Sequence, residues 1–219
     1  MTGGTVGRAG PTPQPGPEDA GHAALVRAAA ELLASDGPDA LTVRRIAARA
    51  KCSTMLVYSR LGGKNGIVDA LFIDGFRQLA ALMRAGRNTS DPVADLRTCA
   101  GRYRKFALTH APSYAVMFER AIPDYQPSPE ALTVASQTLD ILAEQVQRAI
   151  DAGAFPAQPA REIAACLWAT NHGVVSLELK HVGPPDIDWA KRHRQVIDAM
   201  LAGLARADEA TRPPARARA

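Results

Sequence analysis

The chain has 219 residues, of which 47% are hydrophobic and 22% are charged. This composition supplies ample material for a hydrophobic core and excludes a disordered or collagen-like polypeptide. The longest stretch without a charged side chain runs from Ile163 to Leu177, which is too short and too polar to cross a bilayer. Residues 1–20 lack the apolar run of a secretory signal, so we expect a cytoplasmic protein without a membrane span.

The excess positive charge is confined to one short segment. The net charge is +4, and residues 22–64 hold seven basic and three acidic groups, a surplus of four. The remainder of the chain therefore balances to zero. Residues 41–64 contain six basic groups and no acidic one, whereas a solvated helix face normally mixes the two signs. This pattern favours a polyanionic partner for the segment.

An all-α fold is predicted, because apolar residues recur at helical spacing along most of the chain and strand-like alternation is absent. Gly37 ends the first helix, Thr42 caps the second and Ser53 caps the third. Residues 1–20 and 207–219 lack periodicity and are expected to be a disordered arm and tail. About nine helices are expected, the later ones near residues 64–84, 92–110, 112–120, 128–151, 159–182 and 188–206.

Residues 42–61 have the spacing of a helix-turn-helix unit, in which two short helices are joined by Lys51, Cys52 and Ser53. The amino end of the second helix of such a unit is exposed and fits the major groove of double-stranded DNA. Any two short helices in a bundle share this spacing, so the charge of the segment is what favours DNA over ordinary packing. Apolar side chains are placed to hold the pair against the first helix at Val43, Ile46, Ala47, Ala50, Val57 and Leu61.

Two stretches of the chain resemble one family. Residues 22–68, which read HAALVRAAAELLASDGPDALTVRRIAARAKCSTMLVYSRLGGKNGIV, resemble the DNA-binding domain of the tetracycline-repressor-like (TetR) family of bacterial transcriptional regulators. The later stretch LWATNHGVVSLELKH resembles the effector-binding domain of one branch of that family. Its Trp-His-Gly signature falls here on Trp168, His172 and Gly173. The resemblance implies a helix-turn-helix DNA-binding domain at 21–66 and a helical domain for effector binding and dimerisation at 67–206.

The resemblance also implies which residues meet operator DNA. Phosphate contacts are implied for Thr42, Tyr58 and Lys64, and helix amino ends do attract anions. Base-edge positions are implied for Arg44, Thr54, Met55 and Arg60; arginine suits guanine, and Met55 and the Thr54 methyl suit a thymine methyl. The expected DNA-binding set is completed by Arg45, Ser53 and Ser59. Tyr58 has an alternative explanation as a core aromatic residue with an exposed hydroxyl.

The chain departs from the family pattern at two places. Lys51 stands where glycine is usual in the turn, and a left-handed backbone there costs up to about 1–2 kcal/mol relative to glycine. The turn is therefore strained or reshaped. Met55 and Leu56 are more apolar than the usual residues, which puts base reading by the second helix in question and leaves more of it to Arg44.

The helices of residues 92–206 are candidates for a sensor of a small hydrophobic effector. Ordinary core packing explains the same side chains, and a hydrogen-bonded core histidine is the alternative explanation of His172. The expected effector-binding residues are Tyr103, Phe106, Tyr114, Met117, Phe118, Trp168 and His172.

Enzyme and metal chemistry are not predicted. Glu178 and His181 have a ligand-compatible spacing, but no second such pair occurs, and no catalytic motif or cofactor-binding loop is present. Two alternatives to a DNA-binding regulator remain. One is a helical interaction protein whose basic segment meets an acidic protein surface, and the other is a helical enzyme that uses His172.

The resemblance further implies that the last two helices pair with those of a second copy to form a homodimer. Two recognition helices would then read a pseudopalindromic operator, and the effector would release a repressor from it. A monomer would bury the same apolar positions internally. These positions are Ile163, Leu167, Val174, Leu177, Val196, Ile197, Met200, Leu201 and Leu204.

Overall fold

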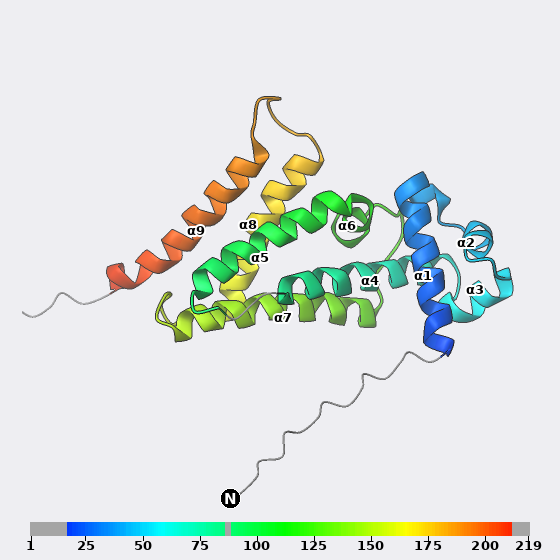
Figure 1. Ribbon diagram of the computed structural model, residues 1–219, viewed down its shortest axis with the longest axis horizontal. Coiled ribbons are helices and arrows are strands. Elements are labelled where there is room, and N and C mark those ends of the chain that lie inside the picture. Colours follow the sequence, from blue (N-terminus) through cyan, green and yellow to red (C-terminus); the bar gives the residue numbers. More distant parts are fainter. Residues whose placement is uncertain (1–16, 86–88, 212–219) are drawn as a thin grey trace, which may run out of the picture.

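The computed structural model describes residues 17–85 and 89–211, which form nine α-helices and one short 3₁₀ turn and contain no strand (Figure 1). The all-α prediction is therefore confirmed. The helices are α1 (Pro17–Asp36), α2 (Val43–Arg49), α3 (Thr54–Leu61), α4 (Lys64–Arg84), α5 (Pro92–Thr109), α6 (Ala111–Phe118), α7 (Pro129–Asp151), α8 (Ala160–Leu179) and α9 (Trp189–Thr211).

The helix boundaries differ from the predicted ones mainly at the ends of the chain. Helix α1 begins at Pro17, inside the segment expected to be a disordered arm, and α9 continues to Thr211, inside the expected tail. Proline at the first helical position fits the start of α1, because its missing N–H has no intrahelical partner there. The rest of the expected arm and tail, residues 1–16 and 212–219, lies outside the described residues.

Helices α1, α2 and α3 form a small head at one end of the molecule (Figure 1). The two predicted caps are confirmed: Thr42 Oγ1 accepts the Arg45 N–H at 3.4 Å and Ser53 Oγ accepts the Leu56 N–H at 3.2 Å. Small and aliphatic side chains allow the three helices to pack closely. The fully buried residues of this core include Leu25, Ala29, Ile46, Val57 and Ile67.

Helix α4 joins the head to a larger helical body. Its first turn lies directly on the end of α3, where a Cβ on Gly66 would stand 1.6 Å from the Leu61 carbonyl oxygen. Any larger side chain at Gly66 would therefore push α3 away from α4. From there α4 runs into the body beside α7 and contacts α5 and α6, and α7 continues beyond the end of α4 (Figure 1).

The body contains two groups of buried residues. One is continuous with the head and follows α4 through α5, α6 and α7, and the other lies between α5, α7, α8 and α9. The loop before α5 is tied to α7 because Arg148 bonds Asp95 at 2.9 Å and the Thr89 carbonyl at 2.8 Å. Within the described part of the chain, no helix has the length and apolar character needed to span a membrane.

Candidate nucleic-acid interface and ligand cavity

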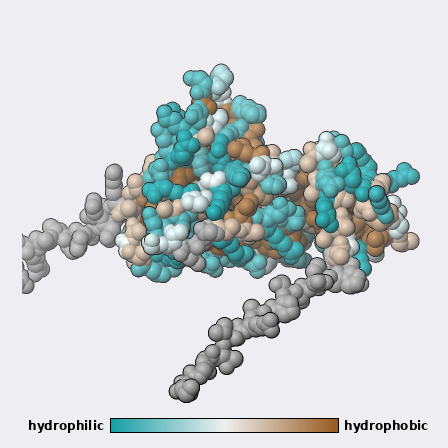
Figure 2. All heavy atoms as spheres, viewed as in Figure 1, coloured by the Kyte–Doolittle hydropathy of each residue, from teal (hydrophilic) through white to brown (hydrophobic). Residues whose placement is uncertain are grey.

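The ten side chains expected to meet DNA all lie on the exposed surface of the head, at α2, α3 and the start of α4. On α3, Met55 is 77% exposed and Tyr58 is 58% exposed. Figure 2 shows hydrophobic atoms at the surface over α3, among the hydrophilic atoms of the head. The core-aromatic explanation of Tyr58 is therefore wrong, since its ring as well as its hydroxyl faces solvent.

The basic residues of the head fall into two groups. Arg45 pairs with Asp36 at 2.5 Å and Arg49 pairs with Glu31 at 3.3 Å, so α1 neutralises two of the cations of α2. In the described residues, no acidic side chain pairs with Arg44, Lys51 or Lys64. The positive charge that remains for a polyanion is concentrated on these side chains, and Arg45 is held toward α1.

The turn between α2 and α3 carries the predicted strain. Lys51 has a φ of 53°, in the left-handed region, so the turn keeps the usual geometry without the usual glycine. The Lys51 side chain is exposed beside the capped amino end of α3, where backbone N–H groups favour an anion. Ser59 uses its hydroxyl locally, donating to the Leu56 carbonyl at 3.1 Å.

The helical body contains a cavity of about 340 Å³. Four of the seven expected effector-binding residues line it: Tyr103, Met117, Phe118 and Trp168. Phe106, Tyr114 and His172 do not belong to the lining. The wall is completed by residues of α4, α5, α7, α8 and α9, namely Phe72, Phe76, Leu79, Met83, Leu96, Cys99, Ala100, Ala135, Ser136, Thr138, Leu139, Leu142, Leu167, Asn171, Ile197 and Leu201.

His172 lies behind the cavity wall in a polar network that joins three helices. Its Nδ1 is hydrogen-bonded to the Tyr114 hydroxyl at 2.6 Å and to the Tyr103 hydroxyl at 3.2 Å, and the two hydroxyls lie 3.0 Å apart. Burial lowers the pKa of His172, so the neutral ring is favoured. Burial raises the pKa of Tyr103 to about 12, although hydrogen bonds from Tyr114 and Trp168 oppose this rise. The core-histidine explanation of His172 thus matches its surroundings.

Sequence reasoning missed the contributions of α4 and α7 to the cavity. Phe72, Phe76, Leu79 and Met83 repeat at intervals of three and four on α4, as a core stripe and a cavity wall both do. On α7, four lining residues, Ala135, Thr138, Leu139 and Leu142, follow the same spacing. No signal in the sequence distinguishes such a face from ordinary packing.

The arrangement gives no support to a catalytic site at His172. Glu178, a carboxylate on the same helix as His172, accepts two hydrogen bonds from Arg104, at 2.7 and 2.5 Å. Neither His172 nor Glu178 belongs to the cavity lining. In the described ranges, no three His, Cys, Asp or Glu side chains lie close enough together to hold a metal ion.

The two helices expected to form a dimer interface, α8 and α9, pack part of their apolar surface against other helices of the same chain. Ile163, Leu167, Ile197 and Leu201 are buried against α5 and α7, so these four are part of the chain's own core. The other five expected positions are half-buried or exposed, and Leu177 is 44% exposed. An exposed stripe remains along α8, one residue each turn, at Ala169, Gly173 and Leu177.

Two family models match the chain. The model of bacterial regulatory proteins of the tetR family matches residues 25–71, and the model of the tetracyclin repressor-like C-terminal domain matches residues 96–188. The first covers the head and the start of α4, and the second covers α5 to the loop before α9. No curated protein matches.

Solved structures share the fold over nearly their whole length. A protein of unknown function from Rhodococcus sp. RHA1 is 25% identical, with a TM-score of 0.73 over 84% of this chain and 95% of that one. The putative regulatory protein SCO4313 is also 25% identical, with a TM-score of 0.69 over 87% and 100% of the two chains. The TetR family transcriptional regulator PfmR from Thermus thermophilus is 19% identical, with a TM-score of 0.60 over 82% and 98%.

Proposed function

This chain belongs to the tetracycline-repressor (TetR) family of bacterial regulatory proteins, and from that premise we propose that it is a homodimeric repressor in the cytoplasm. In this proposal it binds operator DNA through the head and leaves it when a small hydrophobic effector occupies the cavity. The observation that carries the proposal is the exposed face of α2, α3 and the start of α4, on which the ten expected contact residues lie together. The sequence of residues 41–64, which forms this face, contains no acidic residue.

The exposed face supports distinct roles for its residues. Lys64 begins α4 and Thr42 caps α2, so their side chains lie where backbone N–H groups already attract phosphate. Arg44 is exposed and has the forked donors that suit guanine, at roughly 1–3 kcal/mol of discrimination for one such contact. Met55 is the most exposed large apolar side chain of the recognition helix and suits a thymine methyl.

A second copy is the partner that the α8 surface suits. The stripe of Ala169, Gly173 and Leu177 is exposed in the single chain, and a Cβ on Gly173 would meet no atom within 4 Å. Small residues of this kind permit close contact between helices, and a two-fold interface uses the same surface on both subunits. Two heads held in this way would read two half-sites about one helical turn apart.

Effector release follows from a shared helix. Helix α4 begins at Lys64, an expected phosphate contact of the head. The same helix supplies Phe72, Phe76, Leu79 and Met83 to the cavity wall. A ligand that prefers one position of α4 therefore favours one position of the head, and DNA affinity changes by the ratio of ligand affinities for the two states. In this proposal the effector prefers the state in which the two heads no longer fit both half-sites, so it lowers the affinity for DNA.

The test is DNA binding by Arg44→Ala and Lys64→Ala. An operator is first selected from a random duplex library, and affinity is then measured by fluorescence anisotropy across a range of salt concentrations. We expect Lys64→Ala to weaken binding to all duplexes and to reduce the salt slope by about 2, since the dimer loses one phosphate contact in each half-site. Arg44→Ala should weaken the selected operator most, since it loses a base contact.

The matched control is Arg97→Ala, which removes an exposed arginine of the body that pairs with Asp198 at 2.7 Å. It should leave the affinity for DNA unchanged. Wild-type affinity in both head variants would overturn the proposed interface. Tight binding to an acidic protein surface, without the steep loss of DNA affinity with salt, would favour an interaction protein instead.

A further inference from the structure

The cavity lies where the two groups of buried residues in the body meet. The group that continues into the head supplies Phe72, Phe76 and Met117 to the cavity wall. The group beside α9 supplies Ile197 and Leu201. A molecule in the cavity would therefore contact both cores, and its surroundings would be mainly apolar side chains.

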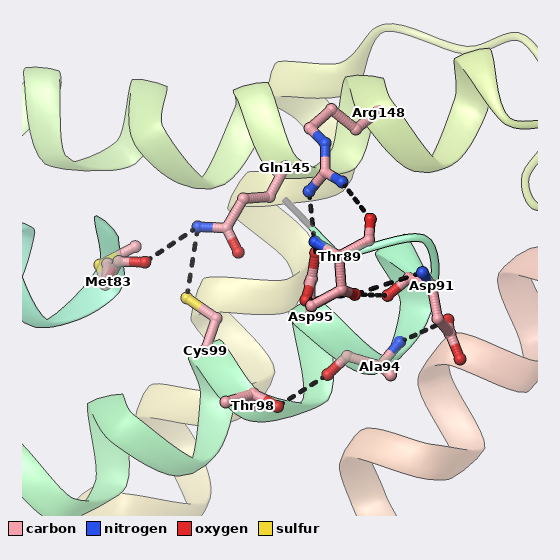
Figure 3. Close-up of polar contacts among 9 residues, drawn as sticks. All are labelled: Met83, Thr89, Asp91, Ala94, Asp95, Thr98, Cys99, Gln145 and Arg148. Atoms are coloured by element: carbon pink, nitrogen blue, oxygen red, sulfur yellow. Dashed lines mark hydrogen bonds and ion pairs between the residues drawn. The ribbon is translucent and has the colours of Figure 1, made fainter. Parts of the chain in front are cut away.

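The cavity lining contains no charged side chain. Of the described residues, twenty line the cavity, and none of them is Asp, Glu, Lys, Arg or His. Asp95 directly precedes the lining residue Leu96, but its carboxylate pairs with Arg148 at 2.9 Å (Figure 3). Transfer of an ionised group into such surroundings is unfavourable unless a counter-charge meets it. The lining therefore disfavours an ion.

The buried polar side chains of the lining are occupied by partners in the protein. Thr138 Oγ1 donates a hydrogen bond to a carbonyl of its own helix at 3.1 Å. The Asn171 amide oxygen is 2.7 Å from Nε2 of His193, and the Asn171 amide nitrogen donates to a carbonyl of α5 at 3.5 Å. Cys99 Sγ accepts a hydrogen bond from Nε2 of Gln145 at 3.7 Å (Figure 3). A polar group of a ligand would have to displace one of these bonds.

The cavity opens between α7 and α8, where two of its lining residues, Ser136 and Trp168, are exposed. Ser136 Oγ accepts a hydrogen bond from Arg161 at 2.9 Å, and the Trp168 side chain is hydrogen-bonded to Tyr103. Arg161 also pairs with Asp140 of α7. An ionic group at the opening would therefore have to break an existing ion pair to gain a counter-charge there.

The volume of the cavity sets the size of the ligand. A cavity of about 150 Å³ lined by aliphatic and aromatic side chains holds one benzene molecule. The cavity of about 340 Å³ has room for about twice as many atoms, roughly ten to fourteen non-hydrogen atoms.

We propose that the cavity takes an uncharged hydrocarbon of roughly ten to fourteen non-hydrogen atoms, without a hydrogen-bonding group. Its affinity comes from apolar contact, because the polar side chains of the lining keep their partners in the protein. A ligand that carried a hydroxyl, ammonium or carboxylate group into the cavity would lose the hydration of that group without replacement. That this ligand is the effector rests on the proposed function, whereas its binding to the cavity does not.

The test compares four probes of one shape by isothermal titration calorimetry at pH 7.4, with the full chain injected into the probe solution. Butylbenzene is the parent. A hydroxyl, ammonium or carboxylate group replaces its terminal methyl group in 3-phenylpropan-1-ol, 3-phenylpropan-1-aminium and 4-phenylbutanoate. We expect butylbenzene to bind tightest, the alcohol at least about tenfold more weakly and both ions at least about 100-fold more weakly. A loss of less than tenfold for any polar probe, or no saturable binding of butylbenzene, overturns the proposal.

The methionine residues show where the probe binds. Met83 and Met117 line the cavity, whereas Met55 is 77% exposed on the head. In the full chain labelled with ¹³C at the methionine methyl groups, we expect nuclear Overhauser effects between butylbenzene and the methyl groups of Met83 and Met117. Effects at Met55 alone, or at no methionine, overturn the assignment to the cavity.

A substitution that fills the cavity tests the same assignment. Ala135→Leu adds three carbon atoms to the α7 wall, so the affinity for butylbenzene should fall at least about tenfold. Gln137→Leu is the matched control, because Gln137 is exposed on the same helix outside the lining, and its affinity should stay unchanged. Circular dichroism checks that each variant is folded, and Ala100→Leu, in the α5 wall, replaces an Ala135→Leu variant that is not. Unchanged affinity in the folded cavity variant overturns the assignment.

Parallel anisotropy titrations with operator DNA separate this inference from the proposed function. Butylbenzene that binds as expected and leaves the DNA affinity unchanged contradicts the effector role and supports the cavity assignment. Release of DNA by 4-phenylbutanoate, with no binding of butylbenzene, contradicts the ligand class and supports the effector role of the cavity.

Discussion

The contact between α4 and α6 at Gly75 allows a quantitative test of the packing that joins the head to the cavity. Gly75 is buried in the middle of α4, and a Cβ built on it would lie 2.6 Å from Met117 Sδ and 3.0 Å from Met117 Cγ. Real carbon atoms do not approach so closely, so Gly75→Ala forces the Met117 side chain to move. Met117 belongs to the cavity lining, and the cavity is the space into which it can shift.

The expected change in stability is the difference of two terms. Alanine favours a helix interior over glycine by about 0.5–1 kcal/mol, and overpacking a well-filled core costs about 1–3 kcal/mol. Methionine is flexible, which keeps the second term near the lower end of its range. We expect Gly75→Ala to lower the free energy of unfolding by about 0.5–2 kcal/mol.

Gly101→Ala is the matched control, because Gly101 also lies within a helix, α5, and a Cβ there would meet no atom within 4 Å. It should raise the free energy of unfolding by about 0.5–1 kcal/mol. Urea unfolding followed by circular dichroism measures both variants, and an unchanged m-value confirms that the same surface is exposed on unfolding. In a Met117→Ala background, Gly75→Ala should become stabilising, with a coupling energy of about 1–2 kcal/mol. Equal stabilisation by the two glycine substitutions, without coupling, would refute the reasoning.

Three further predictions concern the turn, the α8 surface and the buried tyrosine. Lys51→Gly relieves the positive φ and should raise the urea midpoint by the equivalent of about 0.5–1 kcal/mol, whereas Lys51→Ala keeps the strain and should not. Leu177→Arg should give a folded monomer in sedimentation velocity, whereas Leu132→Arg, at an exposed leucine of α7, should leave the proposed dimer intact. Because the pKa of Tyr103 is raised to about 12, the unfolded chain loses this proton first, so Tyr103 should lower stability from pH 10 to 12 by up to about 1.4 kcal/mol per unit, and the raised pKa values of Tyr114 and Tyr125 add to this fall. Tyr103→Phe should reduce that slope, as urea unfolding at each pH will show.

The head was predictable from the sequence because its signals are local. Caps at Thr42 and Ser53, and a run of basic residues without acids, each depend only on neighbours in the chain. The pairing of Arg45 with Asp36 was not predicted, since it depends on how α1 crosses α2. The strained turn at Lys51 was identified only through the family pattern, because nothing in lysine itself indicates a positive φ.

The cavity was harder to predict because a cavity wall and a packed core use the same residue types. Of the aromatic residues expected to bind the effector, Tyr103 and Phe118 reach the lining, whereas Phe106 and Tyr114 are fully buried elsewhere. The difference is a matter of which side of α5 and α6 faces the gap between helices. Tertiary packing decides which side faces the gap. The periodicity of apolar residues identifies a buried face, but it does not show whether that face meets another helix or a cavity.

Helix α6 contacts both the head and the helices that form the cavity wall. Through Tyr114 it is hydrogen-bonded to His172 of α8, and through Met117 it fills the notch that Gly75 leaves on α4. The same eight-residue helix also lies against α1 of the head. A ligand that fills the cavity leaves the Met117 side chain less room to shift, so the contact of Met117 with Gly75 is where the proposed effector would act on both α6 and α4. The absence of a side chain at Gly75 is therefore what makes room for the contact between α4 and α6.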